Sequence, residues 1–168
     1  MDVFEAVRTI LAVRQYKDQP LPPDVVRRIL EAGRLTASAS NTQPWHFVVV
    51  DQRRTLIELA RLAPTGPYIA QAPLAIVVAI DRTPTAVSDA SRAAQSMMLV
   101  AWGDGVGSNW VGFDRMEAVG QLLGIPNEKE VLAILPFGYP AVVVGRGKKR
   151  RKALSEVASR ERYGQPFE

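Results

Sequence analysis

The segment LAIVVAID, residues Leu74–Asp81, constrains the fold more than any other, because it is apolar without alternation between two faces. A strand with one solvated face alternates apolar and polar side chains, whereas a strand covered on both faces reads as a continuous apolar run. The run has the length of a strand and is far too short for a membrane span. We therefore predict a central strand over residues 74–81, buried on both faces.

Helical and strand patterns are interspersed along the rest of the chain. Apolar side chains at helical spacing predict helices over residues 2–13, 23–35, 52–63, 86–102, 115–124 and 152–164. Apolar and β-branched runs predict strands over residues 46–51, 131–139 and 141–145, with a short strand inside the glycine-rich turn at residues 103–114. Asp114 is placed to cap the helix that follows it. With 168 residues, no repeat and no long linker, residues 1–168 are expected to form a single α+β domain.

The chain is poor in reactive side chains. It has no cysteine, which excludes disulfides, cysteine-based metal sites and a cysteine nucleophile. The single histidine, His46, enters a predicted strand, where a packed side chain is more typical than a catalytic one. One histidine with carboxylates is also a poor basis for a zinc site. We therefore predict no catalytic side chain and no metal; if the protein is an enzyme, a bound cofactor carries the reaction.

Charge and hydropathy indicate a cytoplasmic protein. No apolar run reaches the roughly 18 residues of a membrane span, and the start MDVFEAVRT lacks the basic region of a signal peptide. The net charge is +4, with part of the excess in KKRRK, Lys148–Lys152. That run suits a solvated tail or phosphate binding. Nucleic-acid binding is not expected, because no recognition helix or aromatic-studded surface accompanies it.

Two further motifs have open interpretations. The stretch SASNTQPWHFVVVD, Ser38–Asp51, places small polar residues directly before a strand. A simple turn explains this pattern, and so does a loop that presents amides to a flat polar ligand. The run GDGVG, residues 103–107, is not a dinucleotide fingerprint, because it follows a helix and lacks the G-x-G-x-x-G spacing. Trp102 and Trp110 are more typical of a core or an interface than of ring stacking.

Five segments, in the same order along the chain, resemble the FMN-dependent nitroreductase family. SASNTQPWHFVVV is similar to the family pattern Pro-Ser-x-x-Asn-x-Gln-Pro-Trp-x-Phe, and TILAVRQYKDQPLP lies where the family has Arg-Arg-Ser-x-Arg-x-Phe and a proline linker. DASRAAQSMMLVAWGDGVGSNWVGFD resembles its central helix, glycine turn and Gly-Phe-Asp segment. LLGIPNEKEVLAILPFGYP and KKRRKALSEVASRERYG resemble its Gly-Ile-Pro to Gly-Tyr-Pro segment and its basic C-terminal segment. The chain is identified as a short member of this family.

The resemblance implies a three-layer α+β fold, with a central mixed, mainly antiparallel sheet flanked by helices. It implies a homodimer with active sites at the interface and non-covalently bound FMN. NADH or NADPH would reduce the flavin by hydride transfer to N5, and a nitroaromatic, quinone or similar small acceptor would then be reduced in the same pocket. We also expect the helix from about Ser88 to Trp102 to use its small residues at the subunit interface. The tail Arg160–Glu168 is expected to reach across the partner.

The same resemblance implies a set of cofactor-binding residues. They are Arg14 and Gln15 after the first helix, Ala37 and Ser38 from the partner chain, Asn41 and Gln43 near the flavin ring or bracing the loop, Val111 and Gly112 facing N5, and Lys149 and Arg151 at the phosphate. Two long cations suit a phosphate dianion, because charge-assisted hydrogen bonds are strong. Arg14 is expected to help them hold the phosphate.

Several positions depart from the family pattern. Ile10, Leu11 and Ala12 stand where the family has Arg-Arg-Ser, so one phosphate-binding arginine and one hydroxyl are missing. A lost charged contact costs about 1.5–3 kcal/mol, and Arg8 on the same helix is a candidate to compensate. Ala37 also replaces a proline. These departures support an alternative function, a non-catalytic flavin-binding or structural dimer of the same fold.

Overall fold

The computed structural model describes residues 1–112, 116–142 and 149–167. The α-helices of this part of the chain are α1 (Val3–Thr9), α2 (Pro23–Arg34), α3 (Arg53–Leu62), α4 (Ala86–Gly103) and α5 (Met116–Leu123). The strands are β1 (Trp45–Val50), β2 (Leu74–Asp81), β3 (Gly107–Ser108) and β4 (Lys129–Gly138). Short 3-10 turns form η1 (Ala39–Asn41), η2 (Pro67–Gln71) and η3 (Leu154–Glu156).

The predicted central strand is confirmed as β2. The described strands form a four-stranded sheet in the order β1-β2-β4-β3, in which every neighbouring pair is antiparallel. All residues of β2 from Leu74 to Ile80 are buried, as the apolar run requires. A parallel contact is added by an isolated bridge between Ala12 and Ser108.

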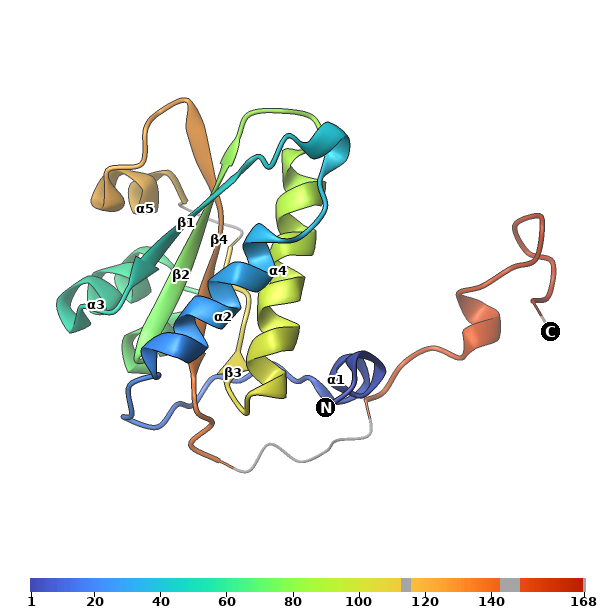
Figure 1. Ribbon diagram of the computed structural model, residues 1–168, viewed down its shortest axis with the longest axis horizontal. Coiled ribbons are helices and arrows are strands. Elements are labelled where there is room, and N and C mark those ends of the chain that lie inside the picture. The colour runs from blue at the N-terminus through green and yellow to red at the C-terminus, as the bar shows by residue number, and fades with distance from the viewer. Residues whose placement is uncertain (113–115, 143–148, 168) are drawn as a thin grey trace.

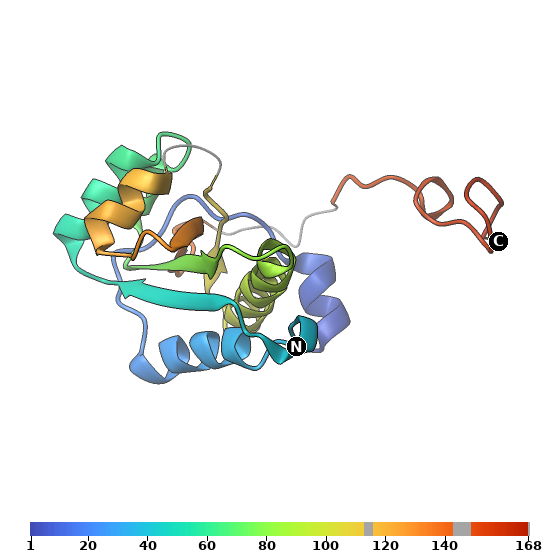
Figure 2. The same ribbon diagram turned by 90° about the horizontal axis from the view of Figure 1, so that it is seen from above.

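Side chains of β2 divide between two helical layers. Ile76 and Val78 belong to a core cluster with α2 and α4, whereas Ala75 and Val77 belong to a cluster with α3 and α5. Figures 1 and 2 show the result, with α2 and α4 on one side of the sheet and α3 and α5 on the other. This confirms the predicted three-layer α+β fold.

The alanines of α4 face inward. Ala90, Ala93 and Ala94 are 0% exposed, and Ala90 and Ala94 lie in the cluster with β2 and α2. A Cβ atom at Gly33 of α2 would meet the Sδ atom of Met97 at 3.0 Å, so the two helices approach closely. These small residues therefore permit a tight contact between α4 and α2 inside the protomer, and the expected place of α4 at a subunit interface stays a prediction.

The first helix is shorter than its predicted range of residues 2–13. Asp2 caps α1 by accepting a hydrogen bond from the Glu5 N–H, and the helix ends at Thr9. Beyond it, the chain runs beside the sheet: the Val13 N–H donates to Ser108 O at 2.9 Å and the Lys17 N–H to Tyr139 O at 2.8 Å. Backbone hydrogen bonds to distant segments thus replace those that a longer helix would make.

The predicted last helix over residues 152–164 is wrong. The structure has only the turn η3 there, and Leu154 and Val157 are 57% and 65% exposed. An isolated short helix is marginal in water unless an apolar face packs against something, and these side chains belong to no apolar cluster of the described residues. Residues 149–167 instead form an arm that runs away from the body (Figures 1 and 2).

Other predictions fall partly outside the described residues. Of the predicted strand at 141–145, Ala141 and Val142 are exposed and form a bend, and the remainder lies outside the description. The capping residue Asp114 and the lysine at the start of KKRRK lie outside it too. Lys149–Lys152 have no regular secondary structure.

Candidate functional site

Two groups of the predicted site residues are separated along α4. The loop that carries Ala37, Ser38, Asn41 and Gln43 lies beside the start of α4, where the Ala39 N–H donates to Asp89 Oδ2 at 3.1 Å. Lys149 lies beside α1, which is joined to the other end of α4 by a hydrogen bond from Trp102 Nε1 to Thr9 Oγ1 at 2.9 Å. Figure 1 shows this separation between η1 and α1. One protomer therefore does not bring the two groups together.

The loop has an unusual backbone. Ser40, Asn41 and Gln43 adopt φ values of 48°, 56° and 50°, in the left-handed region that non-glycine residues rarely occupy. Ser38 shapes the loop, because its Oγ accepts from the Gln43 N–H at 2.9 Å and its carbonyl from the Asn41 N–H at 3.1 Å. Backbone strain of this kind persists only where the surroundings over-determine it, and it often occurs in binding loops.

Asp89 fastens this loop to α4, and the sequence analysis missed it. Its side chain is 0% exposed and accepts hydrogen bonds from the Ala39 N–H and the Arg92 guanidinium. A buried carboxylate requires such partners, because desolvation without them is costly. The available signal was an acidic residue within a helix of mostly small and apolar residues.

Arg14 lies over an aromatic ring that the sequence analysis also missed. Its guanidinium carbon is 5.9 Å from the centroid of Tyr68, within cation–π range. The Tyr68 hydroxyl accepts from Asn109 Nδ2 at 2.8 Å, and Asn109 Oδ1 accepts from the Trp110 N–H at 2.8 Å. These contacts connect Arg14 to the segment that leads into Val111.

Gln15 and Tyr16, which follow Arg14 in the chain, are also held by hydrogen bonds. The carbonyl of Gln15 accepts from the Ala141 N–H at 2.9 Å, and the Gln15 side chain is exposed. The Tyr16 hydroxyl donates to Val13 O at 2.7 Å. Burial, and after it the nearby Tyr68 hydroxyl, raises the pKa of Tyr16 far above its ordinary value, so Tyr16 stays a neutral donor.

Val111 and Gly112 pack against β4. Val111 is 2% exposed, and its N–H donates to Ile134 O at 3.0 Å. Gly112 is buried, and a Cβ atom there would lie 2.6 Å from Leu132 O. The Val111 N–H is therefore already used. The Gly112 N–H has no acceptor among the described residues, so it can donate to a ligand.

A cationic groove of about 610 Å³ lies beside α1. It is lined by Phe4, Val7, Arg8, Ile10, Gln95, Lys149 and Arg151. Lys149 Nζ donates to Val7 O at 2.7 Å. Burial, followed by the charges of Arg151 and Arg8, lowers the pKa of Lys149 below its ordinary value of 10.5. The groove brings together the two predicted phosphate cations; Arg14 is not among its lining residues.

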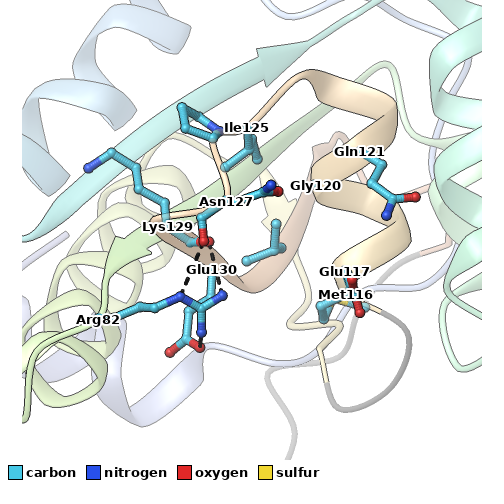
Figure 3. A pocket seen from close by; sticks show the side chains of 11 residues that line it. Arg82, Met116, Glu117, Gly120, Gln121, Ile125, Asn127, Lys129 and Glu130 are labelled. Carbon is cyan, nitrogen blue, oxygen red and sulfur yellow. Dashed lines mark hydrogen bonds and ion pairs between the residues drawn. The ribbon is translucent and has the colours of Figure 1, made fainter.

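A second pocket, of about 470 Å³, lies between α5 and β4 (Figure 3). Its cations are already paired, since Arg82 donates to Glu130 at 3.1 Å and to the carbonyls of Asn127 and Lys129 at 3.4 Å. Lys129 is paired with Asp81. No predicted site residue lines this pocket.

His46 lies in β1, as predicted for the strand, but its side chain is exposed rather than packed. Within residues 1–112, 116–142 and 149–167, no group of three or more acidic or histidine side chains is placed to hold a metal ion. No helix in those ranges is both long and apolar enough to span a membrane.

Comparisons with known proteins place this geometry in a family. The profile of the nitroreductase family matches residues 8–66 and 63–139. A protein of Methanothermobacter thermautotrophicus, named as a predicted NADH dehydrogenase/NAD(P)H nitroreductase, is 35% identical over 150 residues, which cover 84% of this chain and 78% of that protein.

Solved structures agree with the sequence comparison. A protein of the same name from Bacteroides thetaiotaomicron superposes with a TM-score of 0.88 at 29% identity, covering 96% of this chain and 98% of its own. An FMN-dependent nitroreductase from Clostridium difficile gives a TM-score of 0.78 at 26% identity, covering 91% and 93%. The chain belongs to the nitroreductase family.

Proposed function

We propose that two copies of this chain form a homodimer that holds FMN at its interface and uses NADH or NADPH to reduce small acceptors. The class, an NAD(P)H-dependent flavin oxidoreductase, follows from the family and from relatives named for FMN and NAD(P)H. Nitroaromatics, quinones or similar small molecules are the acceptors that we propose.

The single observation that carries the site assignment is the separation of its two halves along α4. The polar loop lies beside the start of the helix, whereas the cationic groove is lined by Gln95 at its middle and by α1, which is hydrogen-bonded to Trp102 near its end. The outward face of α4 carries exposed Ser88, Arg92 and Gln95. If two copies pack these faces antiparallel, the loop of one protomer meets the groove of the other, and one flavin spans both.

The groove fits the phosphate end of FMN. Lys149 and Arg151 lie in it together, and the lowered pKa of Lys149 reflects burial and the repulsion of neighbouring cations. A phosphate dianion offsets that repulsion and accepts charge-assisted hydrogen bonds from both side chains. Ile10 and Ala12 contribute no polar side chain here, so the remaining cations hold the phosphate.

The C-terminal arm supports the dimer. Leu154, Val157 and Phe167 are 57%, 65% and 40% exposed, and the arm leaves the body of its own protomer. Apolar side chains held away from their own core are typical of a segment that packs on another subunit. We propose that the arm, including Arg160–Phe167, covers the partner.

FMN, when bound, would supply the hydride-transfer chemistry between NAD(P)H and the acceptor. The chain's own groups bind and orient. Asn41 and Gln43 present exposed polar groups from the loop, and the Gly112 N–H offers a main-chain donor. Gln15 follows Arg14, which lies over Tyr68, and the Tyr68 hydroxyl is hydrogen-bonded to Asn109. No side chain of this set is required to act as an acid or base.

The visible absorption spectrum of the purified protein, repeated on the supernatant after heat denaturation, tests the cofactor. We expect a two-banded flavin spectrum that is released into solution, followed by oxidation of NADH or NADPH with a nitroaromatic or quinone acceptor. A protein that stays colourless after soaking in excess FMN and desalting would contradict the proposal and favour the non-catalytic dimer.

A truncation tests the dimer separately. Removal of residues 154–168 should shift the sedimentation mass from dimer towards monomer at low micromolar protein concentration. The body should stay folded, because η3 and the following residues contribute nothing to the buried clusters. A truncated protein with an unchanged mass would contradict the role of the arm.

A further inference from the structure

We infer that Arg8 is the third cation of the phosphate site and replaces the arginine that Ile10 lacks. The sequence made Arg8 a candidate to compensate for that loss, and the structure adds its position in the cationic groove. The inference rests on the proposed function, because it takes the FMN phosphate as the ligand.

Arg8 and Arg14 differ in their position relative to the cationic groove. Arg8 lines the cationic groove together with Lys149 and Arg151. Arg14 is not a lining residue, and its guanidinium lies over Tyr68 instead. The position that the family pattern reserves for an arginine, Ile10, also lines the groove but carries no charge. Arg8, two residues earlier, brings a guanidinium to the same space.

Electrostatics supports this grouping. Arg8 and Arg151 both help to lower the pKa of Lys149, so the three charges are close enough to repel one another. A phosphate dianion placed among them turns that repulsion into attraction for all three. The Arg8 side chain is 52% exposed, so an anion can reach it from solvent.

Glu5 prepares the Arg8 side chain for an anion. Arg8 donates from Nε to Glu5 Oε2 at 2.8 Å and from its terminal nitrogen to Glu5 Oε1 at 2.7 Å. This paired contact uses two of the five guanidinium N–H donors, so three remain for a second anion such as a phosphate. The contact holds the long side chain on the groove side of α1, which reduces the conformational entropy lost on binding.

The test compares FMN with riboflavin, which carries the same ring system without the phosphate. Apo-protein is prepared, and both dissociation constants are measured by flavin fluorescence for wild type and Arg8→Ala. The chain offers a matched control, Arg34→Ala, because Arg34 makes the same paired contact with Glu31, at 2.8 and 2.5 Å, on the exposed surface of α2. A lost charged contact predicts that Arg8→Ala weakens FMN binding at least about tenfold.

The two ligands separate the outcomes. Weaker FMN binding with unchanged riboflavin binding in Arg8→Ala, and no change in Arg34→Ala, supports the inference. Unchanged FMN binding in Arg8→Ala overturns it, and so does an equal loss for both flavins, which indicates local distortion. Arg8→Lys should recover part of the FMN affinity. A wild-type protein that binds neither flavin would instead overturn the proposed function.

Discussion

Asp89 and Ala39 are 50 positions apart, yet the buried carboxylate of Asp89 accepts the main-chain N–H of Ala39 at 3.1 Å. The same carboxylate accepts from Arg92, one helical turn further along α4. The contact fastens a loop with three left-handed residues to the most deeply packed helix of the fold. A loop that is strained and anchored in this way is pre-organised for a ligand.

Asp89→Ala should therefore destabilise the protein and loosen the loop. Removal of a buried charged acceptor predicts a fall of about 1.5–3 kcal/mol in the free energy of unfolding. Weaker FMN binding should accompany it. Denaturant unfolding and flavin titration measure both effects.

A surface ion pair provides the control for Asp89. Glu58 and Arg61 have the same spacing on α3, and their side chains are 40% and 70% exposed. Glu58→Ala should cost only about 0.2–0.5 kcal/mol. If Asp89→Ala proves as mild as this variant, the carboxylate does not anchor the loop.

The affinity for FMN should depend on pH through Lys149. The pKa of this lysine is lowered, so its charge is lost at a lower pH than that of an ordinary lysine. FMN binding should weaken as the pH rises through that lowered pKa, at a lower pH than an ordinary lysine would cause. Arginine keeps its charge at such pH values, so Lys149→Arg should remove the alkaline decline.

Dissociation constants measured as a function of pH would check the role of Lys149. The shape of the profile is the readout, because arginine and lysine differ in absolute affinity. Superimposable profiles for wild type and Lys149→Arg would show that another group titrates. The double variant Lys149→Ala, Arg151→Ala should weaken FMN binding at least about tenfold at neutral pH.

Gly112→Ala should destabilise the fold. A Cβ atom at this position would lie 2.6 Å from Leu132 O and 3.0 Å from Ala133 Cα, so backbone rather than a flexible side chain would have to move. Such overpacking costs about 1–3 kcal/mol of unfolding free energy. Thermal or denaturant unfolding measures the loss.

Gly103 offers a neutral counterpart to Gly112. It ends α4, and a Cβ atom added there meets nothing within 4 Å. Gly103→Ala should leave stability unchanged or raise it by up to about 1 kcal/mol, because the unfolded chain loses freedom. An equal loss in both variants would mean that the close approach at Gly112 is not responsible.

His46→Ala should retain turnover with NAD(P)H and an acceptor. The histidine is exposed on β1, and no hydrogen bond to another described residue orients it. Steady-state rates of the FMN-loaded variant should match wild type. A variant that folds and binds FMN, yet loses all turnover, would show that His46 is catalytic.

The hydrophobic pattern predicted helices and strands correctly where the apolar side chains of the element pack into the core. The continuous apolar run forms β2, as predicted. Leu56 and Leu59, which have helical spacing, are the buried residues of α3. The same rule failed at residues 152–164, because Leu154 and Val157 have helical spacing but belong to no apolar cluster of the described residues. A pattern predicts a helix only when a core exists to receive it.

The sequence by itself determined which segments are buried, because hydrophobicity is a property of each side chain and does not depend on its neighbours in space. It also carried the ordered motifs of the nitroreductase family. Only the tertiary structure decided where α1 stops, how Asp89 fastens the loop, and that Arg8 rather than Arg14 shares a groove with Lys149. These features depend on contacts such as that between Lys149 and Val7, 142 positions apart. The spacing of residues along the chain does not predict such contacts, because they join residues that only folding brings close together.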